Sequence, residues 1–113
     1  MTRPNILFIT SHDLGRHLGC YGRDSVRSPA LDQLAEEGVQ FDNSFCTAPQ
    51  CSPSRAALHT GRYAHSVGVL GLAHSPFEWR LDPPEAHFAH RLRQAGYRTA
   101  LVGGQHVTRL EDV

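Results

Sequence analysis

The chain has 113 residues, with 11 Lys or Arg and 11 Asp or Glu, so its formal net charge at neutral pH is zero. A balanced charge gives no electrostatic basis for binding nucleic acid or an anionic membrane, and we exclude both as partners. The length and the hydrophobic content of 40% fit one small globular domain or part of a larger one. The three cysteines form no Cys-x-x-Cys pair, which argues against a disulfide framework and a structural zinc site.

The N-terminal segment MTRPNILFITSHD has a short apolar run that passes straight into polar residues. It lacks the basic start, the long apolar stretch and the small-residue cleavage site of a secretory signal peptide. No segment approaches the length needed to span a membrane. We therefore expect a cytoplasmic protein.

The first predicted element is a buried parallel strand over residues 5–10, where the run ILFI lies between Pro4 and polar residues. The strand delivers His12 and Asp13 to its carboxyl end. In open α/β sheets this edge is where ligands bind, so both residues are candidates for a site.

A helix is predicted to begin at Ser28-Pro29 and to end at Gly38, with an apolar face made by Leu31, Leu34 and Ala35. Residues 39–45 then alternate apolar and polar side chains, which predicts a strand.

The segment CSPSRAALHTGR predicts a helix with Cys51 at its N-terminus, because Pro53 suits the first turn and Gly61 suits the C-terminal cap. The unpaired N–H groups of a helix start and its positive dipole end favour a thiolate or a bound anion. Arg55 follows one turn later on the same face and adds a guanidinium suited to an oxyanion. The pattern indicates an anion site, although a buried structural cysteine has the same local sequence.

Residues 62–84 are rich in Gly, His, Ser and Pro and predict a long irregular connection. A further helix is expected from Pro84 to Gly96, followed by an apolar strand over residues 97–102 that delivers Gln105 and His106. No closing helix is expected over residues 110–113. The order of elements predicts an α/β fold with a mainly parallel sheet flanked by helices.

The motif Cys51-Ser52-Pro53-Ser54-Arg55, followed by Leu58 and Thr60-Gly61-Arg62, resembles the type I sulfatases of the alkaline phosphatase superfamily. The flanking stretches PNIL, DLG, GCYG, PALD and AGYRT are similar to that family in order and spacing. The stretch from Gly71 to His74 is most similar to the heparan N-sulfatase, or sulfamidase-like, branch. The resemblance implies that residues 1–113 are the N-terminal portion of a sulfatase catalytic domain.

By this resemblance, Cys51 would be oxidised by a separate formylglycine-generating enzyme. The hydrated aldehyde is a gem-diol, which attacks sulfur with one oxygen and uses the other to release sulfate. Arg55 would orient the diol and offset its charge, and His106 would hydrogen-bond the sulfate or the diol. The implied activity is hydrolysis of a sulfate ester or sulfamate on a small molecule or a saccharide.

The resemblance also implies a divalent cation, usually calcium, held by Asp13, by His12 and by the modified Cys51. His12 stands where many sulfatases carry an aspartate, and a nitrogen ligand suits manganese or zinc better than calcium. Gln105 stands where the family tends to have a lysine, and we expect Gln105 and His74 to bind substrate through hydrogen bonds.

Sulfatases are several hundred residues long, and the resemblance places the second half of the metal site beyond Val113. We therefore expect the 113 residues alone to be inactive. Two alternatives remain open: a phosphonate or phosphate monoester hydrolase of the same superfamily, and a non-catalytic fragment whose Cys51 stays a thiol.

Overall fold

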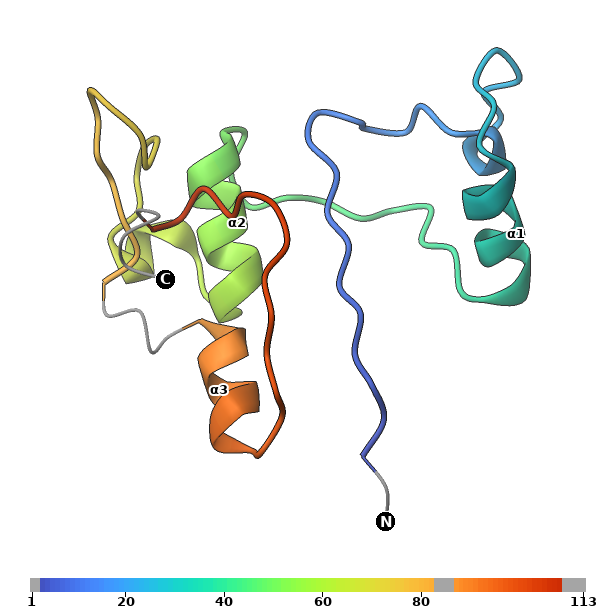
Figure 1. Cartoon of the computed structure of the whole chain (residues 1–113). Coiled ribbons are helices and arrows are strands. Elements are labelled where there is room, and N and C mark those ends of the chain that lie inside the picture. Colours follow the sequence, from blue (N-terminus) through green and yellow to red (C-terminus); the bar gives the residue numbers. More distant parts are fainter. Residues whose placement is uncertain (1–2, 83–86, 109–113) are drawn as a thin grey trace. The chain divides into compact units, whose positions relative to one another are not determined.

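The structure, a computed structural model, describes residues 3–82 and 87–108 (Figure 1). The chain divides into two compact units, Met1–Ser44 and Phe45–Val113, and each is described here by itself. Within the described residues, no helix is long and apolar enough to cross a membrane. The expectations for Pro84 and for residues 110–113 fall outside the described residues. The first unit contains η1 (Gly19–Tyr21) and α1 (Pro29–Glu37), and the second contains α2 (Cys51–Thr60), η2 (Ala64–Val67) and α3 (Phe88–Gln94).

Helix α1 has the predicted bounds, with Ser28 as its N-cap, Pro29 in its first turn and Gly38 as its C-cap. Its apolar face, however, is largely exposed: Leu31 is 44% and Leu34 is 64% accessible to solvent. The bounds of this helix are therefore determined by its local start and stop signals and not by burial of its apolar face.

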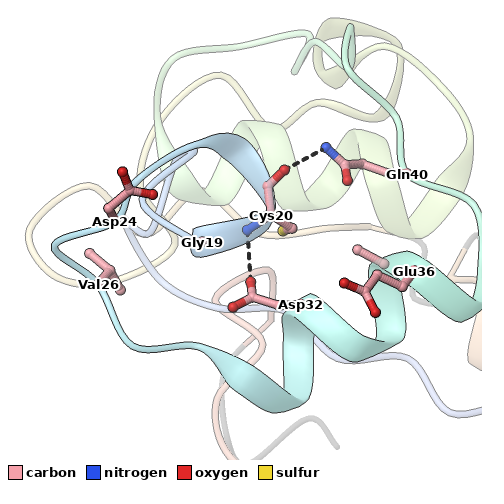
Figure 2. Close-up of a pocket in the computed structure, with 8 residues that line it drawn as sticks. Gly19, Cys20, Asp24, Val26, Asp32, Glu36 and Gln40 are labelled. Atoms are coloured by element: carbon pink, nitrogen blue, oxygen red, sulfur yellow. Dashed lines mark hydrogen bonds between the residues drawn. The ribbon is translucent and has the colours of Figure 1, made fainter.

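Asp32 fastens η1 to α1 through a small hydrogen-bond network (Figure 2). Its Oδ1 accepts from the Cys20 N–H at 2.7 Å and from the Ser28 hydroxyl at 2.9 Å. The Ser28 hydroxyl oxygen in turn accepts from the Gly19 N–H at 2.8 Å. The backbone at Gly19 comes so close that a Cβ there would lie 2.5 Å from an Asp32 carboxylate oxygen. Gln40 completes the network by donating to the Cys20 carbonyl at 3.0 Å.

Helix α2 also has its predicted bounds. Pro53 lies buried in the first turn, where its missing N–H leaves no helical hydrogen bond unmade. Gly61 ends the helix with a φ of 67°, and its N–H donates to the Ala57 carbonyl at 2.9 Å. This left-handed cap is the conformation that favours glycine.

The core of the second unit forms against the small side chains of α2. Leu81 and Val107 are joined by a backbone hydrogen bond of 2.7 Å, which brings the chain after α3 back to α2 (Figure 1). This core fixes both the irregular connection and the segment around residue 106 relative to α2. The cluster comprises Ala56, Val67, Val69, Leu81 and Val107.

Helix α3 begins later than predicted. His87 is its N-cap, and the His87 Nδ1 accepts from the Ala89 N–H at 3.0 Å, so the histidine ring satisfies a first-turn donor. The helix ends at Gln94, and Gly96 follows it with a φ of 85°. The role of Gly96 in stopping the helix is therefore confirmed, and the described helix begins at Phe88, whereas the predicted start at Pro84 lies outside the described residues.

The three predicted strands, residues 5–10, 39–45 and 97–102, are not strands in the part of the chain that the structure describes. Their apolar side chains are exposed: Leu7 is 84% and Val102 is 97% accessible. An apolar run predicts that a segment will be buried, but a strand also needs a neighbour to receive its backbone hydrogen bonds. The parallel sheet is therefore not seen among these residues.

Replacing Gly61 with alanine should lower the free energy of unfolding by about 1 kcal/mol, because a Cβ is disfavoured at positive φ. No atom lies within 4 Å of a Cβ built on Gly61, so the loss would come from the backbone conformation alone. Gly61→Asn is the matched control, since asparagine tolerates this conformation better. Urea unfolding followed by circular dichroism measures both, and equal losses for the two variants would contradict the explanation.

Candidate functional site

Cys51 is the first residue of α2 and is half-buried. The next two residues, Ser52 and Pro53, are buried, so the first turn is anchored in the unit while the thiol lies at the helix end. This is the predicted position, at the positive end of the helix dipole. The arrangement suits an anion bound in front of the helix.

Arg55 and His59 continue the stripe of α2 that begins with Cys51, at successive steps of four residues. Arg55 is half-buried, and His59 is only 6% exposed. Burial lowers the pKa of His59 to about 4, with further lowering by His87 and by the positive charge of Arg55. His59 is thus a neutral side chain at neutral pH, which leaves Arg55 as the cation of this stripe.

His106 lies close to Cys51. A ring nitrogen of His106 and the Cys51 Sγ are within 4.8 Å of each other. His106 is exposed and has a φ of 59°, whereas its neighbours Gln105 and Val107 are both buried. The buried neighbours therefore hold the backbone while the imidazole stays accessible.

His74 joins the same group from the irregular connection. Its ring meets the His106 ring edge-on, with centroids 6.5 Å apart and an interplanar angle of 75°. The His74 Nδ1 lies 3.0 Å from the Ser75 carbonyl oxygen, so in that bond Nδ1 carries the proton. We call Cys51, His74 and His106 the Cys51 cluster.

Gln105, the other predicted substrate-binding residue, is 9% exposed, and its side-chain amide donates to the Thr108 hydroxyl. In this structure it supports the segment that carries His106. Its contact with substrate stays a prediction.

His12 and Asp13 lie in the first unit. The His12 Nδ1 and the Asp13 Oδ2 are 3.3 Å apart, and both side chains are exposed, by 54% and 89%. Ligands at right angles around one cation are about 3 Å apart, so these two donors have a separation that one ion can bridge. An imidazole nitrogen with a carboxylate oxygen fits a divalent cation by donor type.

The first unit also has an open hollow of about 570 Å³ (Figure 2). Three acidic side chains line it: Asp24, Asp32 and Glu36. The oxygen of Asp32 is already used in the network that joins η1 to α1. The hollow contains none of the residues predicted for catalysis, substrate binding or metal binding, and we assign it no catalytic role.

Two residues that matter to this site were missed by reasoning from the sequence. Ser52 is fully buried, and its hydroxyl oxygen accepts from the Ala73 N–H at 2.9 Å. His87 caps α3 and stacks on His59 with ring centroids 4.5 Å apart. The available signals were a serine between Cys51 and Pro53, and a polar residue directly before the apolar spacing of α3.

Comparison with known proteins matches residues 4–112 to the family model described as Sulfatase. Human arylsulfatase D is 43% identical over 111 residues, which covers 92% of this chain and 19% of the relative. Mouse steryl-sulfatase is 45% identical over 113 residues, covering 92% and 18%. The N-acetylgalactosamine-6-O-sulfatase of Bacteroides thetaiotaomicron is 40% identical over 106 residues, covering 93% and 21%. The chain thus spans about a fifth of the length of these relatives. No solved structure matches it significantly.

The His59–His87 stack predicts that acid destabilises the second unit. Burial lowers the pKa of both rings, so the unfolded chain binds more protons than the folded one between about pH 6.5 and pH 4. The free energy of unfolding should therefore be highest above pH 6.5. It should decrease as the pH is lowered, and His59 should account for at most about 3 kcal/mol of this loss. Urea unfolding across this range measures the loss.

The control for this prediction is a pair of variants. His59→Leu removes the buried titrating ring and should flatten the pH dependence, whereas His65→Leu changes an exposed histidine and should leave it unaltered. An unchanged slope in His59→Leu would show that other groups cause the acid sensitivity.

Proposed function

The chain belongs to the sulfatase family, and from this premise we propose that the protein hydrolyses sulfate esters or sulfamates. The observation that carries the proposal is the placement of Cys51 at the start of α2, with Arg55 one turn along and a His106 ring nitrogen within 4.8 Å of the thiol sulfur. A thiol, a guanidinium cation and an imidazole ring therefore occur together. The proposed substrate is a small molecule or a saccharide that carries the sulfate.

The proposed nucleophile is formylglycine, made from Cys51 by a separate generating enzyme. The hydrated aldehyde supplies one oxygen as nucleophile and keeps a second hydroxyl, which loses its proton and forms the aldehyde C=O bond as the C–O bond to the sulfated oxygen breaks and sulfate leaves. The guanidinium of Arg55 orients that group and offsets negative charge beside it. His106 hydrogen-bonds the sulfate oxygens, for which its exposed ring is suitably placed.

We further propose that His12 and Asp13 hold a divalent cation together with the modified Cys51. The 3.3 Å separation of the His12 and Asp13 donor atoms supports this ligand pair. A bound cation supplies Lewis-acid polarisation of oxygen. Calcium is the family's usual metal, and the imidazole of His12 favours manganese or zinc instead.

Turnover is proposed only for the full-length protein, because the chain spans about a fifth of the length of its relatives. The names of those relatives indicate that they act on aryl, steryl and amino-sugar sulfate esters. Because residues 71–74 resemble the corresponding stretch of sulfamidases, the proposed substrate class also includes the sulfamate of an amino sugar.

Mass spectrometry of the peptide containing Cys51 tests the nucleophile. Protein made together with a formylglycine-generating enzyme should show a loss of about 18 Da at Cys51 and should react with aminooxy reagents. Cys51→Ala should abolish sulfatase activity, whereas Cys46→Ala, which changes an exposed free cysteine, should retain it. An unmodified thiol, with generator activity shown on a control substrate, would refute the proposed nucleophile. Comparison of an aryl sulfate, an N-sulfated amino sugar and a phosphonate monoester then assigns the substrate class.

The metal is tested on the full-length protein by chelation and by the Asp13→Asn variant. A chelator should remove both the bound metal and the activity, and Asp13→Asn should weaken metal binding by more than about tenfold because it removes an anionic ligand. Metal content after dialysis and titration calorimetry give readouts that do not depend on turnover. Asp24→Asn, another exposed carboxylate of the first unit, is the control. Equal metal affinities of the Asp13→Asn variant and the unaltered protein would remove Asp13 from the ligand set.

A further inference from the structure

We propose that Ser52 is a positioning residue, which holds His74 beside His106 in the Cys51 cluster through its hydrogen bond to the Ala73 backbone. This inference rests on the proposed function, since it assigns His74 to substrate binding. Ser52 is fully buried, and its hydroxyl oxygen accepts from the Ala73 N–H at 2.9 Å. The bond joins residues 21 positions apart and thereby connects the first turn of α2 to the irregular connection.

The connection forms a closed loop around His74, which we call the His74 loop, residues 71–79. The Trp79 N–H donates to the Leu72 carbonyl at 3.0 Å and closes the loop at its base. At its tip, the N–H groups of Phe77 and Glu78 both donate to the His74 carbonyl, at 3.1 and 3.2 Å. The His74 backbone is therefore held within the loop by its own carbonyl and held to α2 through the preceding residue.

The base of the loop is also tightly packed. A Cβ built on Gly71 would lie 2.6 Å from the Trp79 Cδ1, so the indole occupies the space where a side chain would be. A loop closed in this way moves as a unit. Its attachment to α2 then decides where the His74 ring lies.

A short series of contacts connects this attachment to Cys51, the precursor of the proposed nucleophile. Ser52 follows Cys51 in α2, Ala73 precedes His74, and the His74 ring contacts the His106 ring edge-on at 6.5 Å. The path closes because a His106 ring nitrogen is within 4.8 Å of the Cys51 sulfur. The hydroxyl of Ser52 thus couples the helix that carries the nucleophile to a ring that we place against substrate.

The loss of this hydroxyl would leave the half-buried Ala73 N–H without its acceptor, which is unfavourable enough to shift the loop. Because His74 is placed in substrate binding and not in bond breaking, the effect should fall on KM more than on kcat. Ser52→Ala should raise KM about fivefold and change kcat less than about twofold, as expected for one lost hydrogen bond. Ser52→Thr keeps a hydroxyl and should restore the KM.

The decisive experiment is a double-mutant cycle in the full-length protein with Ser52→Ala and His74→Ala. If Ser52 acts through His74, Ser52→Ala should raise KM in the unaltered protein and have no further effect once His74 is alanine. An equal increase in KM in both backgrounds would overturn the proposal, as would an unchanged KM in Ser52→Ala. Ser66→Ala, which changes an exposed serine of η2, is the matched control.

Two further readouts keep this result separate from failure of the proposed function. Rates are divided by the fraction of Cys51 converted to formylglycine, because Ser52 adjoins the modified residue. Hydrogen exchange of the Ala73 amide should accelerate in Ser52→Ala and not in Ser52→Thr, whether or not the protein turns over a sulfate ester. Unchanged Ala73 exchange in Ser52→Ala would overturn the proposed attachment, while accelerated exchange in a protein without sulfatase activity would refute the function alone.

Discussion

The packing of apolar side chains against Ala56 is the constraint on which the second unit depends. Ala56 faces the core from the middle of α2, and its small side chain allows Val69 and Val107 to become fully buried beside it. These two valines lie in the segments that carry His74 and His106. Because α2 itself carries Cys51 and Arg55, one cluster of apolar contacts positions three separate parts of the chain around the nucleophile.

The helices were predictable because their boundaries depend on local chemistry. Pro53 and Gly61 set the ends of α2, and Pro29 and Gly38 set the ends of α1, without reference to any distant residue. The start of α3 was missed because its cap is a histidine, which is seldom considered a capping residue. The predicted strands depend on pairing with other segments, and the apolar run before His12 does not say which segment will pair with it. Membership of the sulfatase family implies the α/β class, although no sheet is seen among the described residues.

The candidate site was predictable to the extent that a sequence motif encodes it. Cys51 and Arg55 stand at a fixed spacing on one helix, and His106 follows an apolar segment, so local patterns identified all three. The contact of His74 with His106 joins segments more than 30 residues apart, and only its family resemblance had drawn attention to His74. The signal for Ser52, a serine between Cys51 and Pro53, was weak, because a serine in the first turn of a helix is common and its acceptor role depends on a distant backbone amide.

The close fit of Trp79 over Gly71 has a consequence for how the loop can vary. Any side chain at position 71 would displace the indole, since a Cβ would come within 2.6 Å of the ring. The position of the indole at the base of the His74 loop is therefore coupled to a residue that contributes no functional group. A substitution at this glycine would therefore rearrange the base of the loop that carries His74 while leaving the chemical groups of Cys51, His74 and His106 unaltered.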